Sequence, residues 1–462
     1  MNNTDTICAI ATSPGVGAIA IIRVSGSEAF KICEKIFFPR KNNLKISKVK
    51  SHSIHFGTIG DCNNILDEVL ISVFKAPNSY TGEDSVEISC HGSIYIQQKI
   101  QELLIKNGAR YAKPGEFTLR GFLNAKFDLS QSEAVADLIA SNSEASHCLA
   151  IDQMRGGFSK KIKELRAKLV EFASLIELEL DFSEEDLEFA ERPKLMKLLK
   201  EIEKELKKLT DSFSVGNVLK TGIPVAIIGK PNVGKSTLLN ALLNEEKAIV
   251  SDIPGTTRDA IEDTIVIEGI SFRFIDTAGL RNTKNEIEII GVERTYEKIN
   301  QASVILYLFD ISSDTPKEII ENLNDFKDHI NNKNKKFILI GNKIDKLVEM
   351  PHSFKDLVEL ETIYISAKRK ENINLISESL VKSVNFENIS DKTLVSNIRH
   401  YEALSKSLQA IKNIEEGFKN EIPTDLISTD IRDALHHLGE ITGEITTNEI
   451  LDSIFMKFCI GK

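Results

Sequence analysis

The sequence predicts a multidomain α/β protein with an N-terminal α/β domain, a helical domain, and an inserted domain whose sheet is doubly wound and mostly parallel. Three observations support this fold class. The length of 462 residues suits roughly three domains of ordinary size. Residues 221–386 alternate apolar strands with helices, and helical periodicity appears on both sides of that segment. Residues 1–120 instead show short strands separated by turns.

Residues 1–120 are predicted to form the first domain. Short β-like runs occupy Ala18–Val24, Val69–Phe74 and Ser85–Ser89, with Gly and Pro turns between them. A helical stretch, Ile94–Asn107, follows the third run. Strands that are interrupted by helices in this way are typical of an α/β or α+β domain.

Residues 121–220 and 387–462 are predicted to be two parts of one helical domain. In each part, apolar residues recur every three or four positions and therefore fall on one helix face. The positions are Leu165, Leu169, Phe172, Ile176 and Leu180 in the first part, and Leu394, Ile398, Tyr401, Leu404, Leu408, Ile411 and Ile414 in the second. Neither part looks like a complete bundle, so residues 221–386 are predicted to be an insertion, which requires insert termini that lie close together.

The inserted segment contains five predicted strands that are largely apolar, as strands covered on both faces should be. They are Pro224–Gly229, Ser271–Asp276, Ser303–Asp310, Lys336–Gly341 and Thr362–Ser366. Because helical sequence separates these strands, residues 221–386 are predicted to form a doubly wound parallel sheet.

Composition and charge exclude several classes of protein. The chain shows no run of 18 apolar residues and no secretory signal, so we expect no membrane span and a cytoplasmic location. The six cysteines lack CxxC spacing and the nine histidines lack ligand spacing; His436 and His437 are adjacent and are expected to point apart. The net charge is −10, whereas residues 1–120 hold 14 basic and 11 acidic residues. Contact with nucleic acid is therefore expected there, or with the help of a partner.

A phosphate-binding loop follows the first strand of the inserted domain. Residues 229–236, GKPNVGKS, match the GxxxxGK[ST] pattern between a strand and a helix. The glycines allow backbone N–H groups to face phosphate oxygens, and the helix N-terminus adds positive charge. Lys235 is expected to contact the β- and γ-phosphates and Ser236 to bind Mg²⁺. The expected nucleotide-binding residues here are Asn232, Val233, Gly234, Lys235, Ser236 and Thr237.

A second motif at a strand end points to a triphosphate. The motif consists of Asp276, Thr277, Ala278 and Gly279. The Asp276 carboxylate is placed to hold Mg²⁺ through water, and the Gly279 N–H can meet a γ-phosphate and so sense its presence.

Two further strand ends predict that the base is guanine. The first carries Asn342, Lys343 and Asp345, and the second carries Ser366, Ala367 and Lys368. A carboxylate at position 345 can accept hydrogen bonds from guanine N1–H and N2–H₂, which adenine cannot donate. Lys343 can lie over the base, and the second segment can support guanine O6 through a backbone N–H. Four motifs in this order predict a guanine-nucleotide-binding protein that hydrolyses GTP.

The loop between the first two motifs is expected to be a switch, with Thr257 as a second Mg²⁺ ligand. Its residues are Ser251, Asp252, Ile253, Pro254, Gly255, Thr256 and Thr257. Many GTPases orient the attacking water with a Gln after the second motif, but Leu280 occupies that position. Hydrolysis must be assisted in another way, and the residues alone do not decide among Glu286, Glu288, Glu293 and Arg294.

Three features outside the inserted domain resemble those of a known protein family, and the resemblance covers essentially the whole chain. They are the start from Asp5 through Pro14-Gly15 to Gly26, the segments 77–84, 114–117 and 120–126, and the terminal Cys459-Ile460-Gly461-Lys462. With the nucleotide motifs, these features resemble the bacterial tRNA-modification GTPases of the MnmE (TrmE) family. The motifs of the inserted domain alone would also fit ribosome-assembly GTPases.

The resemblance implies a folate site and a potassium-dependent reaction. The N-terminal domain would be similar to folate-dependent aminomethyl-transfer domains, would dimerise, and would bind 5,10-methylene- or 5-formyltetrahydrofolate through Arg23, Glu87, Lys126 and Lys462. K⁺ would take the place of an arginine finger. The positions that match the family's K⁺ ligands are Asn232, Ser251, Ile253 and Thr256, with Ser251 where a Thr is usual. Glu288 matches the family's water-positioning glutamate.

The resemblance also implies a partner and a reaction. The family forms a heterotetramer with the FAD-containing protein MnmG (GidA), and together they add an aminomethyl or carboxymethylaminomethyl group to C5 of the wobble uridine (position 34) of certain tRNAs. GTP hydrolysis would drive conformational change rather than carbon transfer. Cys459 is either a nucleophile beside the folate or a residue that packs the terminus. Two rival hypotheses are a ribosome-assembly factor and a regulatory switch that needs an external activator.

Overall fold

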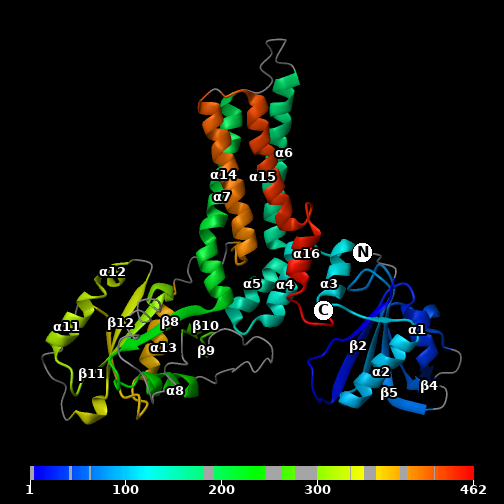
Figure 1. Cartoon of the computed structure of the whole chain (residues 1–462), viewed down its shortest axis with the longest axis horizontal. Helices are drawn as coiled ribbons and strands as arrows, with labels where there is room; N and C mark the ends of the chain where they lie inside the picture. The colour runs from blue at the N-terminus through cyan, green and yellow to red at the C-terminus, as the bar shows by residue number, and fades with distance from the viewer. Residues whose placement is uncertain are drawn as a thin grey trace. The chain divides into compact units, whose positions relative to one another are not determined.

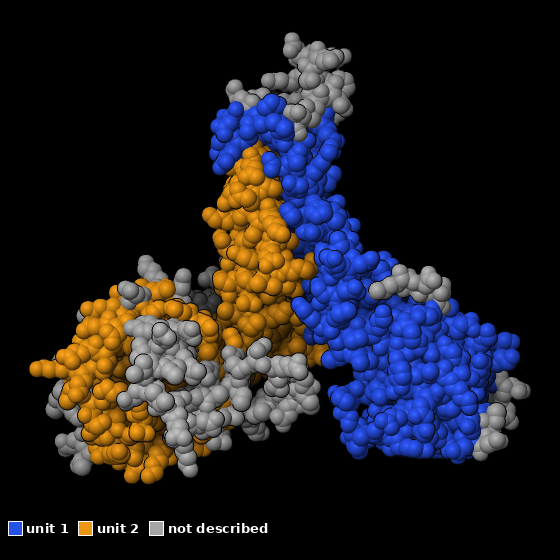
Figure 2. Space-filling view, in the orientation of Figure 1, with its two compact units in different colours: residues 1–136, 153–191, 416–462 blue, residues 137–152, 192–415 orange. Residues whose placement is uncertain are grey.

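A computed structural model of the chain describes residues 5–40, 44–61, 64–181, 192–245, 263–275, 299–332, 335–347, 360–384, 393–420 and 422–462. The chain divides into two compact units, which Figure 2 distinguishes by colour. Unit 1 comprises residues 1–136, 153–191 and 416–462, and unit 2 comprises residues 137–152 and 192–415. Both units take in parts of the segments predicted to be helical. The domain boundaries at 120, 220 and 386 therefore stay predictions.

Unit 1 contains a seven-stranded sheet in the order β3-β4-β5-β6-β2-β1-β7. Its strands are β1 (Ile7–Ile10), β2 (Ile19–Ser25), β3 (Phe37–Pro39), β4 (Ser53–Asp61), β5 (Asn64–Phe74), β6 (Ser85–His91) and β7 (Arg110–Tyr111). Neighbouring strands are antiparallel except β1 and β7. The three predicted strands are confirmed as β2, β5 and β6, with β5 starting five residues earlier than expected.

One face of this sheet carries helices α1 (Ala29–Ile36) and α2 (Ile94–Lys106), which Figure 1 shows beside the strands. Ile32 of α1 and Leu104 of α2 join strand residues such as Ile71 in one buried core. Because side chains alternate along a strand, residues between the core positions face the other way. Leu70 and its cross-strand neighbour Phe56 are both exposed, so the opposite face of β4 and β5 is partly apolar and accessible to solvent.

The other helices of unit 1 include two that pack lengthwise, α6 (Gly157–Asp181) and α15 (Thr424–Thr442). Four of the predicted α6 core positions, Leu165, Leu169, Phe172 and Ile176, are buried, which confirms the periodicity. The remaining helices are α3 (Glu116–Leu123), α4 (Leu129–Ala140), α5 (Glu144–Met154) and α16 (Asn448–Phe455), with α4 and α5 each running from one unit into the other.

Helix α14 (Ile398–Lys419) corrects one expectation, because the predicted helix face began at Leu394, whereas residues 393–397 are not helical. The Asn397 side chain accepts a hydrogen bond from the Arg399 N–H at 3.0 Å, which is the N-cap arrangement that starts a helix. Ile398 is therefore a first-turn residue and is 63% exposed rather than buried. The buried face begins one turn later and includes Leu404 and Ile414.

Unit 2 contains a six-stranded sheet in the order β13-β12-β11-β8-β10-β9. The strands are β8 (Ile223–Gly229), β9 (Asp263–Ile267), β10 (Ile270–Phe274), β11 (Val304–Asp310), β12 (Lys336–Asn342) and β13 (Thr362–Ile365). All neighbouring pairs are parallel except β9 and β10. The prediction missed β9, an edge strand joined to β10 by the turn Glu268-Gly269, in which both residues have positive φ.

Helices cover both faces of this sheet. The seven residues of β11 are all buried, and the six apolar ones alternate between two apolar clusters. One cluster includes α8 (Lys235–Glu245) and α13 (Ile373–Lys382), and the other includes α11 (Pro316–Asn324). The doubly wound, mostly parallel fold is therefore confirmed. Unit 2 also contains α7 (Arg192–Thr221), α12 (Lys327–Ile330) and most of α14.

Length and apolar character decide whether a helix in the described parts of the chain can cross a membrane. None of the helices there is both long enough and apolar enough to span a bilayer.

Candidate functional site

The phosphate loop connects β8 to α8, as the sequence predicted. Gly229 and Gly234 both have positive φ, and a Cβ at either position would clash with Leu308 O or with Asn342 Nδ2, respectively. Only glycine fits such a backbone. Lys235 is the first residue of α8, and its Nζ donates to Gly229 O at 2.7 Å and to Lys230 O at 3.0 Å. The ammonium is therefore bonded to backbone carbonyl oxygens of its own loop.

The other predicted nucleotide-binding residues of this loop flank Lys235 in the sequence. Ser236 and Thr237 lie in the first turn of α8, where the backbone N–H groups of a helix start and the helix dipole favour anions. Val233 is buried, which anchors the loop in the core. Asn232 has a φ of 60° and is exposed, so a non-glycine residue adopts the left-handed conformation at the tip of the loop.

The strand end that was predicted to read guanine contacts the phosphate loop through Asn342. Its Nδ2 donates to Val233 O at 2.8 Å, and its Oδ1 accepts from Lys343 N at 2.8 Å and from Ala367 N at 3.0 Å. One buried amide therefore links three of the four predicted motifs. The bond to Ala367 also occupies one backbone donor of the segment that was predicted to support guanine O6.

Asp345 is held by the fourth motif. Its Oδ1 accepts from Ser366 Oγ at 2.6 Å, and this bond lowers the pKa of the Asp345 carboxyl. The group is therefore ionised at neutral pH, as a carboxylate that accepts two guanine hydrogen bonds must be. Lys368 follows in the same segment and is exposed.

Two residues at the end of β11 belong to this site, and the sequence interpretation missed them. Asp310 Oδ2 accepts from Lys343 Nζ at 2.5 Å, and Asp314 Oδ1 accepts from Lys230 Nζ at 3.1 Å. Both carboxylates follow a buried strand that lies next to β8 and β12 in the sheet. That strand-end position was the available signal, since the carboxyl ends of parallel strands meet at one edge.

Several predicted site residues lie outside the described part of the chain. They are the switch residues Ser251, Asp252, Ile253, Pro254, Gly255, Thr256 and Thr257, the motif Asp276, Thr277, Ala278 and Gly279, and Glu288. Their roles stay predictions.

In unit 1, the structure brings together two of the residues that the resemblance assigned to folate. Arg23 of β2 lies directly opposite Glu87 of β6 in the ladder, and Arg23 Nε and Nη2 approach Glu87 Oε1 at 2.9 and 2.8 Å. The guanidinium also lies over the Tyr80 ring at 5.2 Å and the Phe117 ring at 5.6 Å. Stacking on two aromatic rings fixes the plane of the cation.

The chain terminus joins the same place. Arg23 Nη1 donates to Gly461 O at 3.4 Å, and Gly461 is buried with a φ of 98°. A Cβ on Gly461 would clash with Ile10 O, so the terminus lies directly on β1. Burial, and then the positive charge of Arg23, lower the pKa of Lys462. Cys459 is exposed beside this docked terminus.

Lys126 bonds to a neighbouring loop. Its Nζ donates to Pro77 O at 2.9 Å, in the loop that also carries Tyr80. The structure therefore connects Lys126 with Arg23 through that loop rather than by a direct bond between the two side chains.

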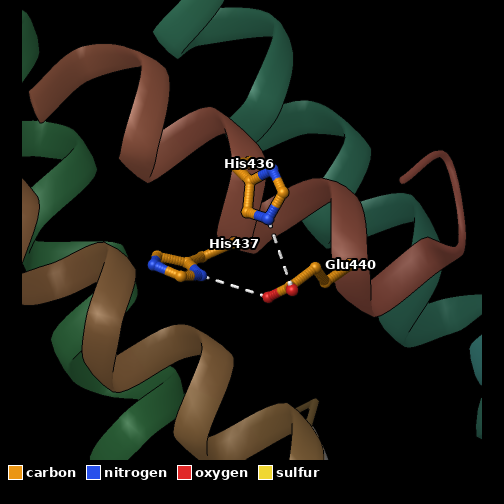
Figure 3. A group of neighbouring side chains, drawn as sticks. All are labelled: His436, His437 and Glu440. Carbon is orange, nitrogen blue, oxygen red and sulfur yellow. Dashed lines mark hydrogen bonds and ion pairs between the residues drawn. The ribbon is translucent and has the colours of Figure 1, made fainter. Parts of the chain in front are cut away.

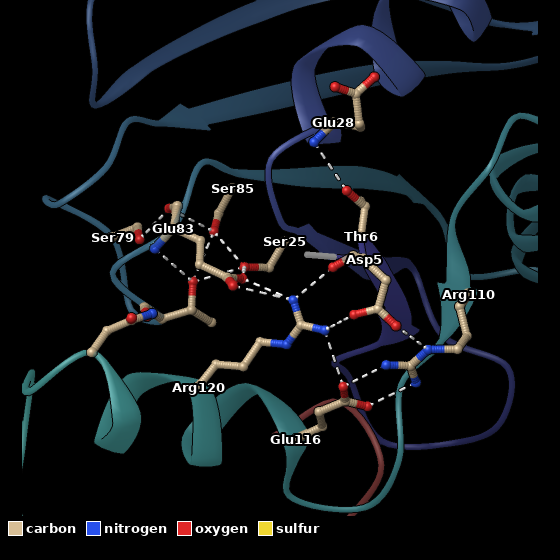
Figure 4. Close-up of polar contacts among 12 residues, drawn as sticks. Asp5, Thr6, Ser25, Glu28, Ser79, Glu83, Ser85, Arg110, Glu116 and Arg120 are labelled. Atoms are coloured by element: carbon tan, nitrogen blue, oxygen red, sulfur yellow. Dashed lines mark hydrogen bonds and ion pairs between the residues drawn. The ribbon is translucent and has the colours of Figure 1, made fainter. Parts of the chain in front are cut away.

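A network of ion pairs around a buried arginine holds Asp5, near the start of the chain (Figure 4). The sequence did not predict this network. Arg120 is 2% exposed and donates to carboxylate oxygens of Asp5, Glu83 and Glu116 at 2.7 to 3.2 Å. Arg110 bonds to Asp5 and Glu116 from the other side. Beside this network lies a cavity of about 490 Å³ that is lined by Asp452 and Phe455 of α16 and by Met456 directly after the helix.

His436 and His437 correct the expectation that adjacent histidines point apart and lack ligand spacing. His436 Nε2 lies 3.4 Å from Glu440 Oε1, and His437 Nδ1 lies 3.1 Å from Glu440 Oε2 (Figure 3). The spacings of four and three residues place both rings beside the carboxylate on one side of the helix. Donor atoms of the three residues lie within 4.8 Å of one another, which is a group that could hold a metal ion.

The fold and the strand-end loops of unit 2 define a class of protein, the P-loop guanine-nucleotide-binding proteins. Two family profiles then match the chain: the one described as the MnmE helical domain over residues 129–459, and the one described as the GTP-binding protein TrmE N-terminus over residues 6–126. The chain belongs to the MnmE (TrmE) family of tRNA modification GTPases.

Full-length relatives support that membership. The tRNA modification GTPase MnmE of Cytophaga hutchinsonii is 53% identical over 100% of this chain and 98% of its own length. The protein of the same name from Flavobacterium johnsoniae is 54% identical over the whole of both chains. Among solved structures, the G domain of the T. maritima FeoB iron transporter covers 35% of this chain and 99% of its own, at 23% identity and a TM-score of 0.27, which is too low to support any inference.

Proposed function

We propose that this MnmE family member hydrolyses GTP and uses the cycle to drive the modification of wobble uridine in tRNA. The observation that carries the nucleotide part is the Asn342 amide, which joins the phosphate loop, the lysine of the guanine motif and the Ser366–Lys368 segment. A nucleotide that bound to these loops would have its phosphates at the N-terminus of α8 and its base beside Asp345.

The residues of unit 2 fit a magnesium nucleotide. The Lys235 ammonium already lies among loop carbonyls and would supply charge to the β- and γ-phosphates. The Ser236 hydroxyl, in the first turn of α8, would be a Mg²⁺ ligand, and the bound ion would neutralise phosphate charge. Asp276 and Thr257, outside the described residues, would complete its ligands.

Potassium is proposed to accelerate hydrolysis in this chain. Asn232 fits that role, because its side chain oxygen is the hard neutral ligand that K⁺ accepts and the residue is exposed at the tip of the loop. The other proposed ligands are Ser251, Ile253 and Thr256. Glu288 would orient the attacking water, since Leu280 cannot. Ser251, Ile253, Thr256, Leu280 and Glu288 all lie outside the described part of the chain.

Unit 1 is proposed to bind a one-carbon tetrahydrofolate at Arg23, Glu87 and Lys462, with Lys126 at its margin. The residues fit the group in chemistry: the Glu87 carboxylate suits the donor-rich pterin edge, and the cations suit the glutamate carboxylates. The contact between Arg23 and Gly461 O supports the inclusion of the terminus. The bound folate would supply the carbon, while Arg23 and Glu87 would orient it.

Cys459 is proposed to act at this site or to secure the terminus. It is exposed, as a reacting thiol must be. The burial of Gly461 equally supports the packing role, so the two roles need a chemical test.

The proposed partners are a second copy of the chain, an FAD-containing protein of the MnmG (GidA) kind, and tRNA, in the cytoplasm. The partly apolar outer face of β4 and β5 supports dimerisation, because Ile54, Phe56 and Leu70 are 66%, 39% and 45% exposed. Residues 121–220 and 387–462 are proposed to form one helical domain that carries the inserted residues 221–386.

Hydrolysis by the isolated chain tests the nucleotide proposal. We expect release of phosphate from GTP but not from ATP, and faster turnover in KCl than in NaCl at equal ionic strength. Equal rates in the two salts would remove the potassium role, and turnover of ATP at the same rate would contradict the base assignment.

A further inference from the structure

Two carboxylates at the end of β11 contact both loops of the nucleotide site. Asp310 is the last residue of the strand and bonds to Lys343 Nζ of the guanine motif. Asp314, four residues later, bonds to Lys230 Nζ of the phosphate loop. One strand end is therefore tied to the two segments that must bind opposite ends of one nucleotide.

The carboxylates are themselves fixed by short local bonds. Asp314 Oδ2 accepts from the Asp310 N–H at 2.9 Å, and Asp310 Oδ1 accepts from Ser312 Oγ at 2.6 Å. Burial alone would raise the pKa of Asp310, but the hydrogen bonds from Lys343 and Ser312 outweigh it and hold the pKa below its ordinary value. Both side chains are 11% exposed, so each ion pair is shielded on its acidic side.

Lys343 carries the constraint from Asp310 into the phosphate loop. Its Nζ also donates to Asn232 O at 2.8 Å. Lys343 and Asn232 both have left-handed backbones, with φ of 72° and 60°, a conformation that costs energy for residues other than glycine. The shared ammonium therefore holds two unfavourable backbone conformations at once, and Asp310 is its charged acceptor.

We propose that Asp310 and Asp314 are positioning residues that hold the phosphate loop and the guanine-reading loop at the spacing of a guanine nucleotide before it binds. This inference rests on the proposed nucleotide binding and adds residues that act through Lys343 and Lys230. Loops that are already ordered lose less conformational freedom on binding, which strengthens affinity without a new contact to the ligand.

The two carboxylates should differ in effect. Loss of the Asp310 charge leaves Lys343 with only neutral acceptors and loosens both loops. Loss of the Asp314 charge releases Lys230, whose side chain is 44% exposed and already largely hydrated. Binding of nucleotide should therefore suffer more from a change at Asp310.

The test measures the affinity of the full chain for a fluorescent GDP. We expect Asp310→Asn to raise Kd about tenfold, which is about 1.4 kcal/mol, and Asp314→Asn to raise it about threefold. Asp310→Glu should recover part of the loss. Glu321→Gln is the matched control, since Glu321 is an exposed carboxylate on neighbouring α11, and it should leave Kd unchanged. With GTP, KM should rise in Asp310→Asn while kcat stays within about twofold.

Two results would overturn the inference while leaving the proposed function intact. One is a Kd for Asp310→Asn within twofold of the wild-type value. The other is an unchanged Kd with fewer sites filled per chain, which is the signature of a variant that merely unfolds. Wild-type protein that binds ADP as tightly as GDP would instead overturn the proposed function, and the inference with it.

Discussion

The two sheets of this chain build their candidate sites in different ways. In unit 2, the site residues follow the ends of parallel strands, and short loops bring them together at one edge. In unit 1, Arg23 and Glu87 lie within antiparallel strands and meet across the ladder, 64 residues apart in sequence. The terminus then closes on Arg23 from 438 residues away.

This difference explains what holds each site together. The loops of unit 2 are joined by neutral and charged hydrogen bonds to backbone atoms, such as those of Asn342 and Lys343. Unit 1 instead uses carboxylates that bond to a guanidinium group removed from water, that of Arg120. Disrupting unit 2 should therefore cost ligand affinity first, and disrupting unit 1 should cost folding stability first.

The largest effect is expected from Asp345→Asn in unit 2. The change replaces the proposed acceptor of two guanine hydrogen bonds by a group that can accept only one and donates instead. GTP affinity should fall at least about a hundredfold, and xanthosine triphosphate should bind better than GTP. Competition binding with both nucleotides measures this, and unchanged GTP affinity would remove the base-reading role.

The next largest effect is expected from Arg120→Ala in unit 1. Removing the buried guanidinium leaves Asp5, Glu83 and Glu116 without their shared partner, which should cost about 3–5 kcal/mol. Hydrogen exchange of the β1 and β2 amides would report the loss. Arg110→Ala is the matched control, because Arg110 bonds to two of the same carboxylates but is 41% exposed, and its removal should cost about 1 kcal/mol or less. Equal losses would show that burial of the network does not matter.

A smaller effect is expected from Arg23→Ala, which removes a proposed folate contact but no buried network. Binding of 5-formyltetrahydrofolate should weaken about tenfold, as for the loss of one charge-assisted bond, while GDP affinity stays unchanged. Arg40→Ala, at an aromatic ring on the same sheet, should bind folate normally. Titration calorimetry would decide, and an unaltered folate isotherm for Arg23→Ala would dismiss the site.

The smallest effect is expected from acid. Hydrogen bonding to Arg110 lowers the pKa of Asp5 from 3.8, and for Glu116 the bonds to Arg110, Lys113 N and Arg120 outweigh burial and lower its pKa from 4.5. A depressed carboxyl pKa stabilises the fold above its unfolded value and loses that contribution as pH falls through the folded value. Hydrogen exchange of β1 should thus loosen below about pH 4.5, and less so in Arg120→Ala. A pH-independent β1 would argue against the network.

The sequence predicted unit 2 more completely than unit 1 for a physical reason. A phosphate loop or a guanine motif is a contiguous segment whose backbone shape is set by local residues, such as Gly229 and Gly234. Asp310 and Asp314 were not predicted as site residues. Their partners Lys343 and Lys230 come within bonding distance only after β11 pairs with β12 and β8. Ion pairs across strands leave no local pattern.

Unit 1 shows the same limit in stronger form. The pairing of Arg23 with Glu87 depends on the register of β2 against β6, and only the resemblance to a family pointed to both residues. In the sequence, Arg120 has no pattern that distinguishes it from an exposed arginine on a helix. The spacings of four and three residues from His436 and His437 to Glu440 were present in the sequence. They were not predicted to form a ligand group, because only spacings between histidines were considered.

The nucleotide site of unit 2 and the proposed folate site of unit 1 are expected to serve one reaction at C5 of the wobble uridine. Nucleoside analysis of tRNA from cells that lack this protein tests that claim most directly. We predict that the C5-modified wobble uridine disappears, that the wild-type gene restores it, and that Asp345→Asn and Arg23→Ala each fail to restore it fully. Intact modified uridine in the cells that lack the protein would contradict the account.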